Sequence, residues 1–365
     1  MVKSCLFIVN GLGLGNSTRC YAVIEKLCAR GVAVHVLTSG NGLFFFSDKA
    51  GIASVTAMDA FFYSGAGGRV SAWKTLLSLP RLRRLERRKE AQLDRLLGQF
   101  RPDAAVIDSE YAVGPLRRRG IPVIGLNNSD VVVSHYLRYM RDRADIRPHF
   151  WLVEFMDYLF HRKNCDLVIS PTPIAYAPRH PRIRHVGLIL RRSVRDMVPP
   201  ARSGAFALPR DCRQFVFMLS GSIFASDVRF EGRPLPFRAD VVGRSGENTA
   251  AVTYHGRLLD NTALLRRADA LVINGGFCAV SEAIALDKPT FAIPVPGHAE
   301  QAVNASMLAQ LGAGLAATEM NVLELIAQRV TVNEWKGFQP KRPVTGLDGA
   351  SEAADLIANF APEPA

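Results

Sequence analysis

Short apolar segments that are each followed by glycine constrain the fold of this chain more than any other feature. Cys5–Val9 is a continuous apolar run followed by the glycine-rich segment Gly11–Gly15, and Ala270–Ile273 is a second run followed by Gly275 and Gly276. Continuous apolar runs of this length are typical of parallel strands that are buried on both faces. Helical spacing follows each glycine segment, so the sequence predicts strand–turn–helix units of the α/β type.

The same rhythm recurs along both parts of the chain. Further strands are expected at Val32–Leu37, Asp103–Ile107, Pro122–Leu126, Gln214–Leu219, Ala251–Tyr254 and Thr290–Ile293. Helices are expected at Ser17–Arg30, Trp73–Phe100, Tyr111–Arg119, Asn261–Arg267, Val280–Leu286, Ala302–Leu311 and Ser351–Phe360. Alternating strands and helices predict a doubly wound parallel sheet in each part.

The length of the chain and a proline-rich segment predict two domains. The 365 residues, 48% of them apolar, are sufficient for two hydrophobic cores. We expect a first domain over residues 1–190 and a second over 212–345. Residues 191–211 contain several prolines and predict a linker, and residues 346–365 predict a C-terminal helix that can pack back on the first domain.

Composition narrows the class of protein. The six cysteines show no metal-binding spacing, which predicts reduced thiols in a cytosolic protein. The sequence shows neither a signal-peptide pattern nor an apolar run of the roughly 20 residues that a membrane span needs. We therefore expect a cytoplasmic protein, which can include a peripheral position on the inner face of a membrane.

The net charge of +12 is concentrated in basic clusters, of which Arg81–Lys89 is the densest. This segment can be a solvated helix face, or a surface that contacts anionic lipid or a polyanionic acceptor. No nucleic-acid-binding module accompanies the charge, so we expect no nucleic-acid partner. The aromatic-rich stretch 136–162 is interpreted as a core-facing helix with its loop, or as an apolar acceptor surface.

The two glycine segments are the first candidates for ligand binding. Parallel sheets bind ligands outside the carboxyl ends of their strands, where glycine lets the backbone approach a ligand and a following helix N-terminus favours an anion. Gly13 and Gly15 are therefore candidates in the first half. The segment is not a dinucleotide-binding fingerprint, because that pattern requires a glycine where Asn16 stands.

The second half carries the more specific pattern. Gly275 and Gly276 open a predicted helix whose amides can bind a diphosphate. Glu282 follows about two turns into this helix, where its carboxylate can accept hydrogen bonds from ribose hydroxyls. Glu300 and Gln301 open the next helix and can bind sugar hydroxyls.

The run from Ala268 to Gly314 strongly resembles the donor-binding half of GT-B glycosyltransferases similar to families 1 and 28, which include UDP-glycosyltransferases and the MurG type. The resemblance implies two Rossmann-like domains that face a central cleft. It assigns the diphosphate to Gly275 and Gly276, the ribose to Glu282, and the sugar to Glu300 with Gln301.

Weaker parts of the resemblance extend it over about residues 5–315. Gly221 and Ser222 match the second phosphate loop of the family, and Arg257 lies in the loop that contacts the nucleotide base. In the first half, Arg19 follows the glycine segment, and Arg30–Val34 matches the family's pattern of arginine and glycine before a strand.

The first glycine segment departs from the family in one important position. The family commonly has a histidine there that acts as the general base, whereas this chain has Asn16, whose amide cannot accept the acceptor's proton. Asp108 is the predicted substitute, because the strand order places it at the same sheet edge; the alternative is that it only caps the following helix. His135 and Asp130 are weaker candidates.

The resemblance implies an inverting transferase that moves a sugar from a UDP-linked, or alternatively dTDP-linked, donor to an acceptor hydroxyl. We expect no cofactor and no metal, because no Asp-x-Asp motif is present. The acceptor can be lipid-linked, a glycan or a small natural product. Two alternatives stay open: a nucleotide-sugar hydrolase or epimerase, which would share the pair Arg19-Cys20, and a non-catalytic nucleotide-sugar-binding subunit, which Asn16 would permit.

Overall fold

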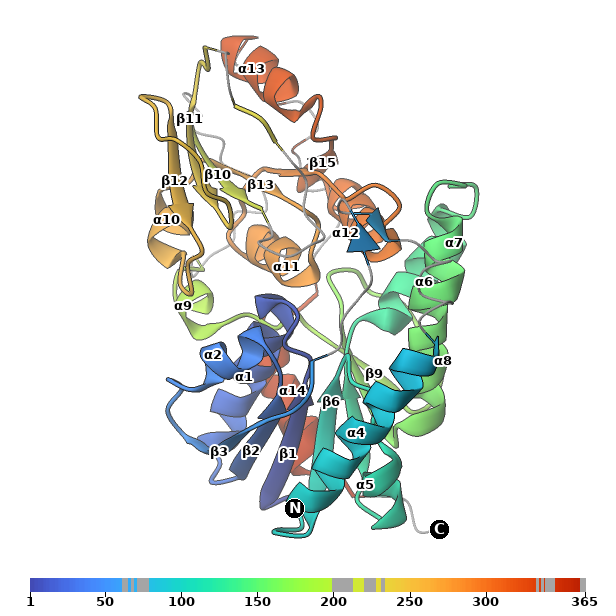
Figure 1. The fold of residues 1–365 in the computed structure, drawn as a ribbon. Helices are drawn as coiled ribbons and strands as arrows, with labels where there is room; N and C mark the ends of the chain where they lie inside the picture. The colour runs from blue at the N-terminus through green and yellow to red at the C-terminus, as the bar shows by residue number, and fades with distance from the viewer. Residues whose placement is uncertain are drawn as a thin grey trace.

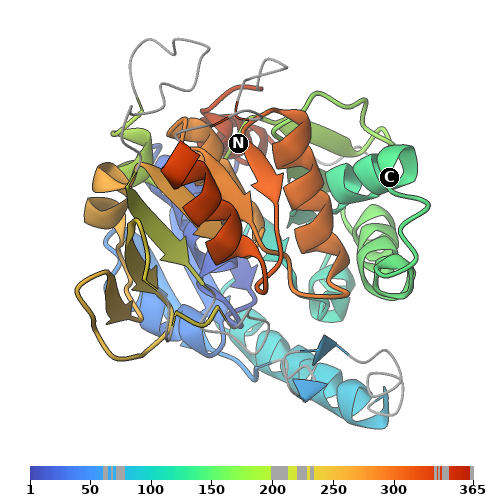
Figure 2. The same cartoon turned by 90° about the horizontal axis from the view of Figure 1, so that it is seen from above.

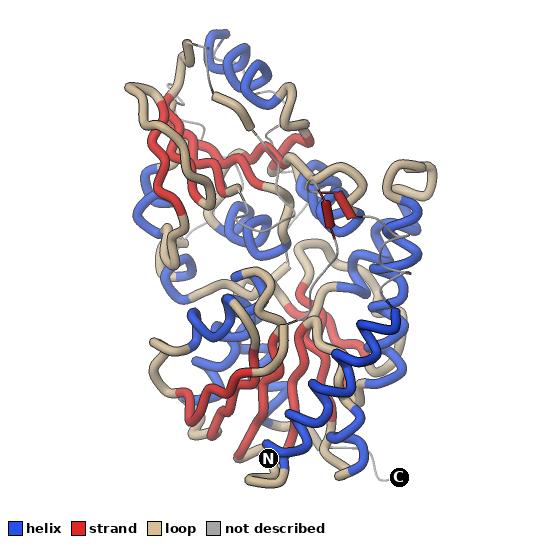
Figure 3. Tube along the Cα trace, viewed as in Figure 1, coloured by secondary structure: helices blue, strands red, loops and turns tan. Residues whose placement is uncertain are grey.

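Two parallel β-sheets form the two halves of the protein in the computed structural model (Figure 1). The structure describes residues 1–60, 65–66, 69–70, 79–198, 213–219, 228–230, 234–332, 335, 338 and 345–361. The first sheet has the strand order β3-β2-β1-β6-β7-β8-β9 and the second β12-β11-β10-β13-β14-β15, and Figure 3 shows them as separate groups of strands. Both sheets are parallel throughout, which confirms the predicted fold class of two doubly wound α/β domains.

Strands and helices alternate through the first half. Its sheet consists of β1 (Ser4–Val9), β2 (Ala33–Thr38), β3 (Ile52–Ala57), β6 (Ala104–Asp108), β7 (Val123–Leu126), β8 (Leu167–Pro171) and β9 (Ile183–Val186). The two-residue strands β4 (Gly65–Ala66) and β5 (Arg69–Val70) form a separate antiparallel pair. The helices are α1 (Leu14–Cys28), α2 (Asn41–Phe46), α4 (Leu79–Leu97), α5 (Gly114–Arg118), α6 (Ser129–Tyr139), α7 (Arg147–His149), α8 (Phe155–Asn164) and α9 (Arg192–Arg195).

The second half repeats the pattern with shorter strands. They are β10 (Gln214–Met218), β11 (Arg238–Val242), β12 (Val252–Gly256), β13 (Ala270–Ile273), β14 (Thr290–Ala292) and β15 (Gly314–Ala316). The helices are α10 (Thr262–Arg267), α11 (Phe277–Ala285), α12 (Ala299–Gln310) and α13 (Val322–Val332). Viewed from above, the second half covers much of the first, and α4 extends along one side of the molecule (Figure 2).

The apolar runs in the sequence become the central strands. Every residue of β6 and of β13 is buried, and in β1 only Ser4 is partly exposed. These strands sit between neighbours on both edges and carry helices on both faces, so they have no solvent-facing side. Their carboxyl ends point toward the other half, and the two glycine turns therefore face each other.

Two segments of the chain join the halves, one between β9 and β10 and one between α13 and α14 (Gly349–Ala358). They touch each other, because the amide of Leu188 donates to the carbonyl of Gly346 at 2.7 Å and the amide of Gly349 donates to the carbonyl of Leu188 at 3.1 Å. α14 packs on α1, and the amide of Val2 donates to the carbonyl of Ala358 at 2.9 Å. The last helix is thus part of the first half.

The aromatic-rich stretch 136–162 is not one helix. It contains the end of α6, then α7, a π-helical turn η1 (Phe150–Glu154) and most of α8. Phe150 stacks on Tyr136 in the core, whereas Trp151 is 44% exposed, so the stretch is partly core and partly surface. Among the residues that the structure describes, no helix has both the length and the apolar character needed to cross a membrane.

Candidate active site

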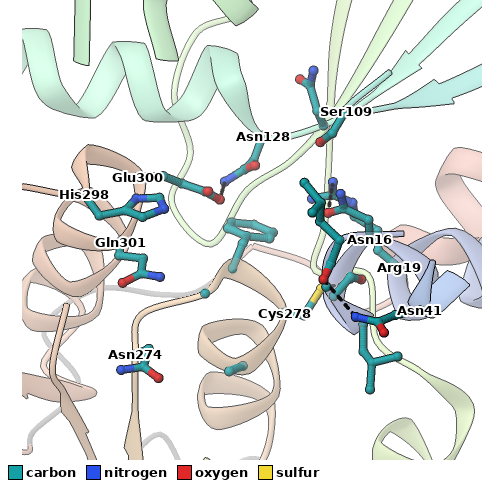
Figure 4. Close-up of a pocket in the computed structure, with 18 of the residues that line it drawn as sticks. Asn16, Arg19, Asn41, Ser109, Asn128, Asn274, Cys278, His298, Glu300 and Gln301 are labelled. Atoms are coloured by element: carbon teal, nitrogen blue, oxygen red, sulfur yellow. Dashed lines mark hydrogen bonds between the residues drawn. The ribbon is translucent and has the colours of Figure 1, made fainter. Parts of the chain in front are cut away.

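A cavity of about 540 Å³ lies between the two halves, where the strands of both sheets end. Loops that follow β1, β6 and β7 line it from the first half, and loops that follow β10 to β13 line it from the second. Figure 4 shows side chains from both halves around this space. Open parallel sheets bind ligands outside the carboxyl ends of their strands, so this cavity is the candidate active site.

The glycine turn after β13 leaves a helix N-terminus open to the cavity. Gly275 has a φ of +80°, and a Cβ atom there would lie 2.7 Å from the carbonyl oxygen of Gln301, so the turn requires glycine. Gly276 lines the cavity as the N-cap of α11, and no side chain of the described residues caps this helix. The amides of the first turn and the positive end of the helix dipole suit an anion such as a diphosphate.

The glycine segment after β1 lines the opposite wall. Gly13 is the N-cap of α1, and Gly13, Gly15 and Asn16 all line the cavity. The side-chain oxygen of Asn16 accepts a hydrogen bond from Nη2 of Arg19 at 3.4 Å. The predicted first-half residues are therefore brought to the cavity, with an amide in the place of an imidazole.

Asp108 ends β6, but its carboxylate does not line the cavity. It is fully buried, and Arg19 donates to both of its oxygens, at 2.6 and 3.0 Å. The thiol of Cys20 and the hydroxyl of Ser109 each donate to it at 3.2 Å. In this arrangement the carboxylate of Asp108 is held by these donors and faces Arg19 instead of the cavity, so its role as the general base, direct or through water, stays a prediction.

The ion pair also affects Arg19. Burial alone would lower the pKa of this guanidinium, but the charge and hydrogen bonds of Asp108 raise it above its ordinary value. Arg19 therefore stays charged and lines the cavity, while the buried carboxylate of Asp108 balances its charge. Arg19, which matches the family pattern, is thus held in position by Asp108, the residue predicted to be the general base.

Glu282 shows a similar arrangement in the second half. Its carboxylate accepts from Arg191 at 2.8 and 3.3 Å, and Glu282 does not line the cavity. Arg191 also donates to Asp260 at 3.0 Å and to Asn261. Burial raises the pKa of Glu282 above its ordinary value, although the charge and hydrogen bonds of Arg191 act to lower it. A ribose could reach this carboxylate only after Arg191 moves, so the ribose role stays a prediction.

Glu300 and Gln301 do line the cavity, on the first turn of α12. Glu300 accepts a hydrogen bond from the side-chain amide of Asn128 at 3.3 Å, a contact that joins the two halves (Figure 4). The side-chain oxygen of Gln301 accepts from the amide of Val295 at 2.9 Å, which fixes the loop before the helix. Both side chains are placed where sugar hydroxyls could contact them.

Two acidic residues of the first half were not found from the sequence. Glu154 of η1 and Asp157 of α8 both line the cavity. Burial raises the pKa of Glu154 well above its usual range, and the charges of Glu300 and Asp157 raise it further. Burial also opposes ionisation of Asp157, but hydrogen bonds from His161 and from the Tyr111 hydroxyl at 2.8 Å lower its pKa overall.

Two histidines meet at the same wall, one from each half. His149 ends α7, His298 is the N-cap of α12, and their ring centroids are 4.8 Å apart. Nδ1 of His149 lies 3.4 Å from a carboxylate oxygen of Glu154 and accepts from the amide of Ala299 at 3.4 Å. Burial lowers the pKa of His149 to about 3, with help from His298, and that of His298 to about 4, so both rings are neutral at pH 7.

The remaining residues predicted for the donor site are Arg257, Gly221 and Ser222, and the structure describes only the first of them. Arg257 follows β12 and lines the cavity, as the resemblance to the base-contacting loop implies. Gly221 and Ser222 lie outside the described residues, so the second phosphate loop stays a prediction.

The two weaker base candidates are not in the cavity. His135 of α6 is hydrogen-bonded to the hydroxyls of Tyr176 at 2.8 Å and Ser306 at 2.9 Å. Asp130 is bonded to His185 at 2.7 Å. Neither residue lines the cavity, and the His135–Ser306 contact joins the halves.

Solved structures resemble this fold along almost its whole length. A complex of LpCGTa with UDP has a TM-score of 0.59 at 14% identity and covers 98% of this chain and 95% of its own. The glycosyltransferase SsfS6 of Streptomyces sp. SF2575 has a TM-score of 0.59 at 16% identity, with 98% and 96% covered. MurG of Acinetobacter baumannii has a TM-score of 0.56 at 16% identity, with 98% and 100% covered. These likenesses establish the GT-B fold.

Sequence comparison gives the family. An uncharacterized glycosyltransferase of Methanopyrus kandleri is 31% identical over 108 residues, which span 28% of this chain and only 30% of that relative. The family described as Glycosyl transferase family 1 matches residues 3–147 and 241–330, which together are more than half of the chain and include both glycine turns. The protein is therefore a glycosyltransferase of the GT-B type that belongs to glycosyl transferase family 1.

Proposed function

We propose that the protein transfers a sugar from a nucleotide-sugar, UDP-linked by its resemblance to UDP-glycosyltransferases, to an acceptor hydroxyl with inversion of the anomeric centre. The observation that carries the proposal is the pair of glycine turns that face one cavity from opposite halves. The donor would occupy the second half, and the acceptor would enter from the first half. The acceptor itself is a lipid-linked molecule, a glycan or a small natural product.

The N-terminus of α11, which no described side chain caps, supports departure of the nucleotide without a metal at the diphosphate. As the bond to the anomeric carbon breaks, negative charge develops on the diphosphate oxygen. The amides at Gly276 and the helix dipole would be directed at that charge on a diphosphate bound there, and would stabilise the transition state with little rearrangement. Arg257 adds positive charge to the same cavity, and Glu300 with Gln301 would hold the sugar.

A second candidate function is binding of a nucleotide-sugar without transfer. This second function is favoured by Asn16 and Asp108, the two residues that were expected at the position of the general base. Asn16 has no proton-accepting group suited to this step, and the carboxylate of Asp108 is held by Arg19. In that case the protein would bind the donor and serve a partner that supplies the base.

Two glycine substitutions test the proposal and separate the two halves. A Cβ atom at Gly276 or at Gly13 would meet no atom of the described residues within 4 Å, and both have backbone angles that other residues adopt. Gly276→Val should therefore fold but fill the space proposed for the diphosphate. Gly13→Val is the matched control on the opposite wall.

We expect Gly276→Val to weaken binding of UDP by at least about tenfold in calorimetry, whereas Gly13→Val leaves it within about twofold, because a blocked anion site loses charge-assisted hydrogen bonds. Equal UDP affinity in both variants would place the diphosphate elsewhere. Release of UDP from UDP-sugars in the presence of an acceptor panel then separates transfer from binding. If the wild-type chain binds the donor but consumes none with any acceptor, the binding function replaces the transferase proposal.

A further inference from the structure

The π-helical turn η1 places two potential metal ligands on one face of the chain. His149 and Glu154 are five residues apart, a spacing that an α-helix would separate by about 140° around its axis. A π-helix instead closes each turn between residues five apart, so the pair comes together, with 3.4 Å between Nδ1 and the carboxylate oxygen. π-helical turns are rare and occur frequently at functional sites.

The fold brings a third ligand from the other half. His298 precedes α12, and one ligand atom from each of His149, Glu154 and His298 lies within 4.8 Å of the others. Zn²⁺ binds imidazole and carboxylate at about 2.0–2.2 Å in a tetrahedron, in which ligand atoms are about 3.3 Å apart. Side-chain rotations would close the present spacing to that distance, and coordination through Nδ1 of His149 would replace its hydrogen bond from the amide of Ala299. All three residues line the cavity, and three protein ligands would leave a fourth coordination position open.

The charges around this cluster also favour a cation. Three carboxyl groups, those of Glu154, Asp157 and Glu300, line the same cavity, and Glu154 is only 8% exposed. Buried carboxyl groups that face one another are costly unless a cation compensates them. The positive end of α12 opposes a metal ion here, but the carboxyl groups of Glu154 and Glu300, which line the same cavity, offset it.

We propose that His149, Glu154 and His298 bind one Zn²⁺ ion that joins the two halves of the protein. A donor set of two imidazoles and one carboxylate suits zinc rather than Mg²⁺ or Ca²⁺, which prefer oxygen ligands alone. The site goes beyond the proposed function, since it is separate from the diphosphate turn and does not depend on sugar transfer. It also differs from the expectation of no metal site, which rested on ligand spacing in the sequence.

Zinc binding to the purified full chain tests the proposal directly. After treatment with EDTA and its removal, calorimetric titration with ZnCl₂ should show one ion per chain and a higher Tm, whereas MgCl₂ should show neither. His149→Ala, His298→Ala and Glu154→Gln should each weaken the Zn²⁺ affinity by at least about tenfold. His180→Ala is the matched control, because His180 does not line the cavity, and it should leave the affinity unchanged.

Hydrogen–deuterium exchange provides a second measurement that needs no variant. Zn²⁺ should slow exchange both at residues 149–154 and at residues 298–301, because one ion contacts both halves. Absence of stoichiometric binding in the wild type overturns the proposal, as does binding that His149→Ala and His298→Ala retain. If those variants fail to fold, unchanged exchange in either segment of the zinc-treated wild type overturns it as well.

Discussion

Each half of the protein holds an arginine–carboxylate pair beside the cavity, and the two pairs differ in what they join. Arg19 and Asp108 are 4% and 0% exposed and connect a helix and a strand of the first half. Arg191 and Glu282 are 17% and 10% exposed and connect the segment between the halves to a helix of the second. The first pair is internal to one domain, whereas the second attaches the joining segment to the second domain.

This difference predicts different consequences when each pair is broken. A fully buried pair leaves an uncompensated charge in the core when one partner is lost, so its loss is a folding defect. A partly exposed pair at a domain junction can open and be rehydrated at lower cost. We therefore expect the first pair to govern stability and the second to govern access of ligands to Glu282.

The largest effect is expected for Asp108→Ala. Arg19 would remain buried without its partner, which should lower the free energy of unfolding by about 3–5 kcal/mol. Urea denaturation followed by circular dichroism measures it. Asp355→Ala is the control, because its pair with Arg30 is on the surface and is expected to contribute less than about 1 kcal/mol. Similar effects of both substitutions would contradict the structural role of Asp108.

A smaller effect is expected for Glu282→Ala. If UDP displaces Arg191 and its ribose takes the carboxylate, the substitution should weaken UDP binding by about 1–3 kcal/mol. Calorimetry with UDP measures it, and Glu324→Ala on the exposed face of α13 is the control. Unchanged UDP affinity would mean that Glu282 serves only to hold Arg191, and the two pairs would then share one structural role.

Gln301→Ala should weaken the sugar-bearing donor by about 1 kcal/mol and leave free UDP unaffected, because the side chain is expected to contact the sugar and not the nucleotide. Comparing the affinities for UDP and for UDP-sugar checks this difference. An equal loss for both ligands would show that the bond from Val295 to Gln301, which shapes the loop, is the one that matters.

The smallest effect for each substituted residue is expected for association of the basic helix α4 of the first half with anionic membranes. Arg83, Arg84, Arg87 and Arg88 are exposed, whereas Lys89 is buried and paired with Glu110 at 2.5 Å. Each exposed arginine should add about 1 kcal/mol to association with anionic vesicles at low salt. Sedimentation should show binding that salt reverses and that Arg87→Gln with Arg88→Gln reduces, with Lys89 left intact. No binding at low salt would leave these charges as a solvated face.

The sequence predicted the strands and glycine turns well because they depend on neighbouring residues. The apolar run Ala270–Ile273 forms β13 with the predicted bounds, and Gly276 caps the following helix. The starts of the two helices that follow the glycine turns were predicted three residues late, at Ser17 and Val280 against the observed Leu14 and Phe277, because the glycine turn already begins the helix. Local pattern was sufficient for the fold class and for the position of the cavity.

The direction of the acidic side chains was not predictable in the same way. Asp108 and Glu282 were expected in the cavity, but each is turned away by an arginine that lies 89 or 91 residues away along the chain. Glu154 lies in a stretch whose aromatic residues suggested packing, and only the π-helical turn directs it inward. The direction of such side chains depends on contacts between distant segments, and the hydrophobic periodicity of the sequence does not encode those contacts.

The contact between the two joining segments determines how the halves can move. Leu188 of one segment is hydrogen-bonded to Gly346 of the other, and a Cβ atom at Gly187 would lie only 2.2 Å from that carbonyl, so glycine permits the close approach. Two separate connections would fix an axis along the line between them, whereas two connections tied at one point act as a single pivot. We therefore expect the second half to tilt about this point, and a contact between the halves such as Asn128–Glu300 to select one orientation.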